Sequence, residues 1–232
     1  MTQQHIINKV SSWYKTAGFY KRLVGFGFQT IQPYLTGKSL LEIGPADGAM
    51  TRLFAPPFTK LTLIEPSKNY VKLLHKQFPQ ADIHQTFIEH FKTEKIFDTI
   101  VMAHVLEHVG QPVSVLKRLR TMMHKKSRLI LIVPNADSLH RNLGVSMGLL
   151  SKTTALNDYD KKLGHKRVYT RSLLQKHIAA AGFKIQSRGG IMLKPLSNNQ
   201  MESWDKKIIE GLFETGKIFP DLCAELFCVC TI

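Results

Sequence analysis

Residues 40–48 read Leu40-Leu41-Glu42-Ile43-Gly44-Pro45-Ala46-Asp47-Gly48. A short apolar run that ends in an acid is followed by a glycine-containing turn, and residues 49–55 then have helical character. Glycine lets the backbone of such a turn come close to a bound molecule, and the helix that follows offers N–H groups without partners. The stretch therefore predicts a strand, a ligand-binding turn and a helix in succession.

A second apolar run, residues 61–64, ends in Glu65 about twenty residues after the first acid. An acid at the end of the second strand of a nucleotide-binding fold is placed to accept hydrogen bonds from a ribose diol. Pro66 and Ser67 follow, and Ser67 can cap the next helix. Together the two stretches predict a site for a nucleoside-containing cofactor at the carboxyl edge of a parallel sheet.

The rest of the chain alternates strands and helices. Further strands are expected at residues 81–85, 97–102, 128–133, 183–185 and 224–230. The helix before the fifth strand is expected to run through Met122 and Met123. Strands separated by single helices form right-handed crossovers, so the pattern predicts an α/β protein with a doubly wound sheet.

We expect a single domain that spans residues 1–232. Its parts are N-terminal helices at 1–36, a cofactor-binding half at 37–134, a helical cap insertion at 135–169 and the C-terminal half of the sheet at 170–232. Within the first part, Gly18, Gly25 and Gly27 are expected to break the helical pattern into two helices.

Composition excludes some classes of protein. No apolar run approaches the length of about 18 residues that a membrane-spanning helix needs, and residues 1–9 have no apolar core of signal-peptide length. We therefore expect a cytoplasmic protein, a monomer or homodimer, without a membrane span. Its three cysteines, Cys223, Cys228 and Cys230, are interpreted as reduced structural thiols.

The net charge of +15 raises the question of a polyanionic partner. The lysines and arginines are spread singly along the expected helices, without long runs or interleaved stacking aromatics. This dispersal favours a basic solvated surface over a nucleic-acid-binding face. A nucleic-acid partner stays open but is not favoured.

Three motifs resemble those of class I S-adenosylmethionine-dependent methyltransferases, in the family's order and on the expected elements. They are residues 42–48, Glu65-Pro66-Ser67, and residues 97–109, which read Phe-Asp-Thr-Ile-Val-Met-Ala-His-Val-Leu-Glu-His-Val. The third is similar to the fourth-strand block of small-molecule methyltransferases, ubiquinone-type O-methyltransferases among them. The resemblance implies a Rossmann-like, doubly wound seven-stranded sheet with an antiparallel last strand, N-terminal helices and a helical cap insertion. A nicotinamide-dependent dehydrogenase would need G-x-G-x-x-G, which the glycines at 44 and 48 do not supply.

The resemblance also implies the cofactor S-adenosylmethionine, with S-adenosylhomocysteine as the product. It places Gly44, Pro45 and Gly48 beneath the methionyl portion, with Glu42 orienting the turn, and Glu65-Pro66 at the ribose hydroxyls.

The adenine and sulfonium ends of the cofactor are assigned in the same way. Phe87 stands where relatives carry an acid, so Phe87 and Ile88 are expected to hold the adenine by apolar contact. Ala103 and His104, at the end of the fourth strand, are expected to line the sulfonium.

The catalytic candidates are His108, His165 and His104, because imidazole titrates near neutrality and can remove the proton of a hydroxyl nucleophile. Each of these histidines could instead pack or cap a helix. Glu107 lies beside them, but no further carboxylate is clearly placed, so no metal is expected. The expected reaction is methyl transfer to oxygen or nitrogen of a small-molecule acceptor.

The cap is basic, which suggests an anionic acceptor, although a solvated basic surface explains the charge equally well. The residues concerned are Arg141, Lys161, Lys162, Lys166, Arg167 and Arg171. A loose likeness to methyltransferases of bacterial saccharide or secondary-metabolite pathways ranks these acceptors first. The alternatives are an RNA or protein methyltransferase that uses the basic surface and, less favoured, a non-catalytic scaffold that keeps the cofactor fold.

Overall fold

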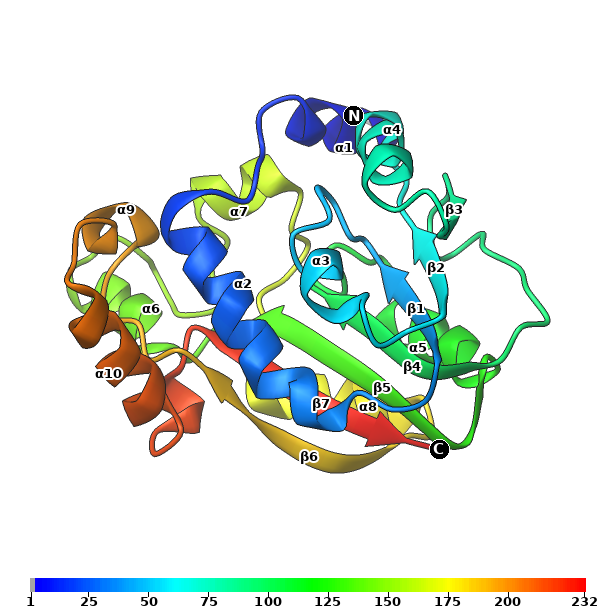
Figure 1. The fold of residues 1–232 in the computed structure, drawn as a ribbon. Coiled ribbons are helices and arrows are strands. Elements are labelled where there is room, and N and C mark those ends of the chain that lie inside the picture. The colour runs from blue at the N-terminus through cyan, green and yellow to red at the C-terminus, as the bar shows by residue number, and fades with distance from the viewer. Residues whose placement is uncertain (1–2) are drawn as a thin grey trace.

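The computed structural model describes residues 3–232 and contains one sheet of seven strands (Figure 1). The strands are β1 (Ser39–Ile43), β2 (Lys60–Ile64), β3 (Asp82–His84), β4 (Phe97–Ala103), β5 (Met123–Pro134), β6 (Lys184–Ile191) and β7 (Glu225–Thr231). Their order across the sheet is β3-β2-β1-β4-β5-β7-β6. The first five are parallel, whereas β7 runs antiparallel to both β5 and β6. This is the Rossmann-like sheet that the sequence predicted.

Helices cover both faces of the sheet (Figure 1). They are α1 (Gln3–Ser11), α2 (Gly18–Ile31), α3 (Thr51–Phe54), α4 (Lys68–Gln77), α5 (Pro112–Arg120), α6 (Leu139–Ser146), α7 (Asp158–Leu163), α8 (Arg171–Ala180), α9 (Asn198–Met201) and α10 (Lys206–Gly216). Short 3₁₀ turns occur at η1 (Gln32–Tyr34) and η2 (Pro220–Leu222). In Figure 1, α2 crosses the near face of the sheet, and α5 and α8 lie behind it.

The side chains of the central strands are divided between two hydrophobic clusters. On one face Ile100 and Leu129 pack with Leu116 of α5 and Ile178 of α8. On the other face residues of α2, α3 and α10 pack on β4, β5 and β7. Because these strands are buried on both faces, they read as continuous apolar runs in the sequence rather than as alternating ones.

Two details of the expected secondary structure were wrong. Gly25 and Gly27 lie inside α2 and do not break it; the interruption is at residues 12–17, just before Gly18. Met123 starts β5 instead of continuing the preceding helix, which ends at Arg120. In both places tertiary packing overrides local propensity, since Gly27 is buried close to Met50 and Met123 pairs with Phe97 of β4.

α6 and α7 lie between β5 and α8, where the cap was expected. The cysteines are buried and free. Among the helices of residues 3–232, none combines the length and apolar character required to cross a membrane.

Candidate active site

A cavity of about 1000 Å³ opens at the carboxyl edge of the parallel strands. Its floor is made by the turn after β1, the end of β2 and the segment after β4, and residues of α1, α2, α6 and α7 complete its wall. Pockets that hold one drug-sized ligand measure about 300–1,000 Å³, so this cavity has room for a cofactor and a small second molecule.

The turn after β1 is held in left-handed backbone conformations. Gly44, Ala46 and Gly48 have φ values of 70°, 49° and 76°. At Gly44 a side chain is excluded by space as well, because a Cβ would lie 2.4 Å from Cγ2 of Val105. Ala46 is thus a non-glycine residue in a conformation that favours glycine.

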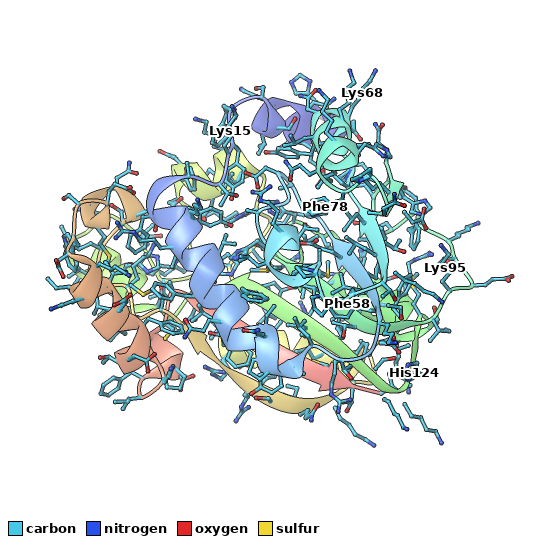
Figure 2. All side chains as sticks on the ribbon, viewed as in Figure 1. Lys15, Phe58, Lys68, Phe78, Lys95 and His124 are labelled. Atoms are coloured by element: carbon cyan, nitrogen blue, oxygen red, sulfur yellow. The ribbon has the colours of Figure 1, made fainter. Side chains whose placement is uncertain are left out.

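Gly48 has a role that the sequence motif did not reveal. It is not among the residues that line the cavity. A Cβ at Gly48 would lie 2.9 Å from the ring of Phe78, which follows α4 and is labelled in Figure 2. The glycine therefore lets the turn pack against the end of α4, whereas Gly44 and Pro45 lie at the cavity itself.

Glu65 is buried at the end of β2 and accepts backbone hydrogen bonds at both carboxylate oxygens. The amide of Ala46 donates to Oε2 at 3.1 Å, and the amide of Ser67 donates to Oε1 at 2.8 Å. Burial raises the pKa of Glu65 to about 7, although these hydrogen bonds oppose the shift. Each oxygen keeps a further lone pair for a ligand donor.

Glu42 lies in the middle of the sheet, one residue before the end of β1. Its Oε2 accepts a hydrogen bond of 2.6 Å from Oγ1 of Thr51, the first residue of α3. Burial is the main cause that raises the pKa of Glu42 to about 8. Glu42 therefore ties the turn to the helix that follows it.

The segment before α2 is tied to the same turn. Thr16 donates to Asp47 from its amide at 2.7 Å and from its hydroxyl at 2.9 Å, and the Tyr70 hydroxyl donates to the carbonyl of Tyr14 at 2.9 Å. Trp13, Tyr14 and Lys15 consequently line the mouth of the cavity. Sequence reasoning missed these residues because their aromatic pattern is also that of ordinary core packing.

The other predicted cofactor contacts also line the cavity. Pro66, Phe87 and Ala103 contribute half-buried surfaces, and Ile88 is buried beside them.

His104 follows β4 with a positive φ of 55°, which turns it between two buried carboxylates. Its Nε2 lies 3.3 Å from Oε1 of Glu225, and its Nδ1 lies 3.8 Å from Oε1 of Glu107. Burial alone would lower the pKa of His104, but the charges of Glu225 and Glu107 and the hydrogen bond that the ring donates to Glu225 raise it to about 9. His104 is therefore an imidazolium at neutral pH.

His108 and His165 come together from distant segments. Their ring centroids are 4.7 Å apart in an edge-to-face arrangement. Nδ1 of His165 lies 3.1 Å from Oδ1 of Asp160, whose other oxygen pairs with Arg141 at 3.2 Å. Asp160 thereby fixes the His165 ring and leaves Nε2 free of this carboxylate. Burial lowers the pKa of His108, so this ring is neutral.

Glu107 lies close to these rings and is fully buried, and among residues 3–232 neither of its oxygens has a hydrogen-bond partner. Ligand atoms of Glu107, His108 and His165 lie within 4.8 Å of one another. One carboxylate and two imidazoles are a donor set that fits a divalent cation, although the same groups can also hold and move a proton.

The basic cap residues are mostly engaged within the protein. Arg141 donates to the carbonyls of Thr153 and Ala155, and Arg167 donates to those of Leu106 and Val109. Arg171 pairs with Asp221, Lys161 with Asp158, and Lys162 lies over the ring of Trp13. Lys166 is exposed at the cavity wall.

Sequence reasoning also missed Glu225 and Lys194, which lie on the β7 and β6 side of the cavity. Glu225 begins β7 opposite Pro134, and Lys194 follows β6. A polar residue at the start of an otherwise apolar strand was the one available signal for Glu225.

The fold is that of a class I methyltransferase. Residues 13–188 match a family model described as a methyltransferase domain. The chain belongs to this family and is an S-adenosylmethionine-dependent methyltransferase of the small-molecule type, with S-adenosylmethionine as its methyl donor.

Individual relatives agree with this assignment. The chain is 28% identical over 171 residues to the ubiquinone biosynthesis O-methyltransferase of Aeromonas salmonicida (strain A449), covering 71% of this chain and 70% of that protein. An S-adenosylmethionine-dependent methyltransferase of Thermotoga maritima has a TM-score of 0.68 at 15% identity and covers 99% of both chains. The plantazolicin methyltransferase BpumL, solved with a pentazolic desmethylPZN analog and S-adenosylhomocysteine, has a TM-score of 0.62 at 20% identity over 96% of this chain and 89% of that one. These two structures show the likeness of fold.

Proposed function

We propose that this enzyme transfers the methyl group of S-adenosylmethionine to an oxygen or nitrogen of a small anionic metabolite, a hydroxyl being the favoured nucleophile. One observation carries the proposal. The same cavity joins the turn after β1 and Glu65 on one side to His108 and His165 on the other. The relative of Aeromonas salmonicida is named as an O-methyltransferase, which supports oxygen as the target.

The cofactor would lie along the carboxyl ends of β1, β2 and β4. Glu65 would accept hydrogen bonds from the ribose hydroxyls, and the methionyl portion would lie against Gly44 and Pro45, which line the cavity. Phe87 and Ile88 would contact the adenine ring, with Pro66 beside them. Ala103 would then face the sulfonium, whereas the imidazolium of His104 would be directed toward Glu225 and Glu107 instead of this second positive charge.

Methyl transfer is an in-line displacement, so the enzyme must align the nucleophile and accept its proton. We assign the proton to Nε2 of His165, because Asp160 holds the opposite nitrogen and orients the ring. His108 packs against this ring and, being neutral, can share the proton. His104 is a poorer base, since it is already protonated between Glu225 and Glu107; it would position the methyl acceptor instead.

The proposal is tested first by calorimetry of the purified chain with S-adenosylmethionine and S-adenosylhomocysteine at micromolar protein. We expect both to bind, and S-adenosylhomocysteine to remain bound when His165 is replaced by Asn. A screen of hydroxy acids with methyl-labelled cofactor then reads transfer directly. Absence of cofactor binding by the wild type would refute the proposal.

The alternative is a polymeric acceptor, RNA or protein, held by the basic surface. The case for a polymeric acceptor is weakened because Arg141, Arg167 and Arg171 make contacts within the protein. Salt-dependent binding of transfer RNA that competes with methyl transfer would favour this alternative.

A further inference from the structure

Lys194 is a buried lysine in the wall of the cavity, opposite the turn after β1. Its exposed fraction is 8%, which is rare for a lysine. Lys194 comes two residues after Met192, whose φ is 63°. The carbonyl of Met192 accepts a 2.8 Å hydrogen bond from the amide of Ala224. The chain is therefore anchored to the start of β7 just before Lys194, and the side chain lies at the cavity.

The ammonium group has one neutral partner. Nζ of Lys194 donates to Oδ1 of Asn198 at 2.7 Å. Asn198 is the first residue of α9, whose start is fixed by a capping box between Ser197 and Gln200. Of the carboxylates in residues 3–232, none comes within 4.0 Å of the Lys194 ammonium. A buried ammonium without a paired anion is costly, and burial lowers the pKa of Lys194 to about 8.

The groups around Lys194 do not supply the missing counter-ion. The charge of Glu225 raises the pKa of Lys194, which opposes the effect of burial. However, Oε1 of Glu225 lies 3.3 Å from Nε2 of His104 and pairs with that ring. His140, on α6, has its pKa lowered to about 3 by burial and by the charges of Lys194 and Arg141, so it is neutral. Nδ1 of His140 is buried and unpaired within the described residues, which leaves a polar atom as well as the ammonium on this side of the cavity.

We propose that Lys194, oriented by Asn198, binds an anionic group of the methyl acceptor, a carboxylate or a phosphate. The inference rests on the proposed function, because it places the methyl acceptor in the cavity that also takes the cofactor. It replaces the basic cap as the source of anion recognition. An anion on Lys194 would give this ammonium a direct partner, which it lacks because Glu107 and Glu225 both face His104.

The position of Lys194 separates it from the cofactor half of the cavity. Lys194 follows β6, and Glu65 follows β2; β6 is the edge strand at the opposite end of the sheet from β3 and β2. An anion held at Lys194 would therefore belong to the second molecule, and its binding should not require the residues of the turn after β1.

The experiment titrates the chain loaded with S-adenosylhomocysteine, using inorganic phosphate, benzoate and the neutral isostere benzamide as probes. We expect phosphate or benzoate to bind at millimolar concentrations and benzamide to bind at least tenfold more weakly. Lys194→Met should abolish this preference, and Lys194→Arg should retain part of it. Lys15→Met is the matched control, because Lys15 lines the same cavity but is exposed at its mouth (Figure 2).

Protonation gives a second readout that a purely structural lysine would not produce. Anion binding by the wild type should weaken as pH rises through about 8, where Lys194 loses its charge in the free protein, and this dependence should vanish in Lys194→Met. The titratable groups that interact with Lys194 are Glu225 and His140, and His140 is already neutral over this range. His104, which pairs with Glu225, has a higher pKa of about 9 and loses its charge above this range.

Three outcomes would overturn the inference. They are an equal affinity for benzoate and benzamide, unchanged anion binding in Lys194→Met, and loss of S-adenosylhomocysteine binding in that variant, which would assign Lys194 to the cofactor's own carboxylate. If the wild type fails to bind S-adenosylhomocysteine, the proposed function fails instead. The same anion titration on the protein alone then still decides the role of Lys194.

Discussion

The backbone amide of Ala46 donates a hydrogen bond of 3.1 Å to Oε2 of Glu65. This bond joins the turn after β1 to the end of β2, and the bond from Ser67 to Oε1 of Glu65 continues it into α4. The acid that we propose for the ribose is therefore also bonded to the turn that we propose for the methionyl portion. We expect its replacement to affect both parts of the proposed cofactor site.

Glu65→Ala should weaken S-adenosylhomocysteine binding by about tenfold or more, because it removes charged hydrogen bonds to two hydroxyls. The affinity of Glu65→Gln for S-adenosylhomocysteine should fall between those of the wild type and Glu65→Ala, since the amide keeps one acceptor oxygen. The measurement is calorimetry, with Glu94→Ala as the control because Glu94 is exposed and outside the cavity. An unchanged affinity in Glu65→Ala would remove the ribose assignment.

Glu42→Gln should stabilise the protein at alkaline pH. The folded-state pKa of Glu42 is raised to about 8, above its ordinary value, so its contribution to the free energy of unfolding is full in acid and lost as pH rises through about 8. Glutamine keeps an acceptor for the Thr51 hydroxyl and does not ionise.

Thermal unfolding measures this effect. The melting temperatures of wild type and Glu42→Gln should agree at about pH 4 and diverge by several degrees at about pH 9, with the variant higher. The pKa of Glu65 is raised as well, so the stability of the Glu42→Gln variant should still depend on pH to some extent. A constant difference at all pH values would show that Glu42 does not take up a proton on folding.

The half of the cavity that we propose for the cofactor could be located from the sequence because its residues are close in sequence and carry a backbone requirement. Gly44 must approach Val105, and Glu65 must follow a strand beside that turn, so both leave a local pattern. The half that we propose for the methyl acceptor has no such pattern. Asp160, Lys194 and Glu225 reach it from three separate segments, and their burial and pairing depend on how those segments pack.

The basic cap is a second case in which the sequence pattern did not predict what the side chains contact. Charge in the sequence indicated an anion site, but the fold uses Arg141 and Arg167 to satisfy carbonyl oxygens and places a buried lysine elsewhere. Spacing cannot distinguish an arginine that binds a ligand from one that closes a loop, because both sit among polar residues. The distinction comes only from the partners of the guanidinium group.

His165→Asn should lower kcat by about a hundredfold while leaving S-adenosylhomocysteine affinity near that of the wild type, because it removes the proton acceptor and no predicted cofactor contact. Asp160→Asn should lower kcat less, with KM unchanged, since the ring loses its charged partner but keeps its packing against His108. The split between kcat and KM is the informative readout. A rise in KM alone would make His165 a binding residue.

The cluster of Glu107, His108 and His165 allows two ways to remove the proton of the nucleophile, a histidine base or a bound metal ion. If His108 and His165 act as bases, turnover should survive dialysis against EDTA, and Glu107→Gln should lower kcat because His104 loses one of its carboxylate partners. Cofactor affinity should stay unchanged after EDTA dialysis and in the Glu107→Gln variant. The cluster formed by Glu107, His108 and His165 has the donors for a divalent cation, so the experiment adds Mg²⁺, Mn²⁺ and Zn²⁺ separately after dialysis. Activity that disappears with EDTA and returns with one of these ions would contradict the base assignment, because the cluster would then activate the nucleophile through a metal.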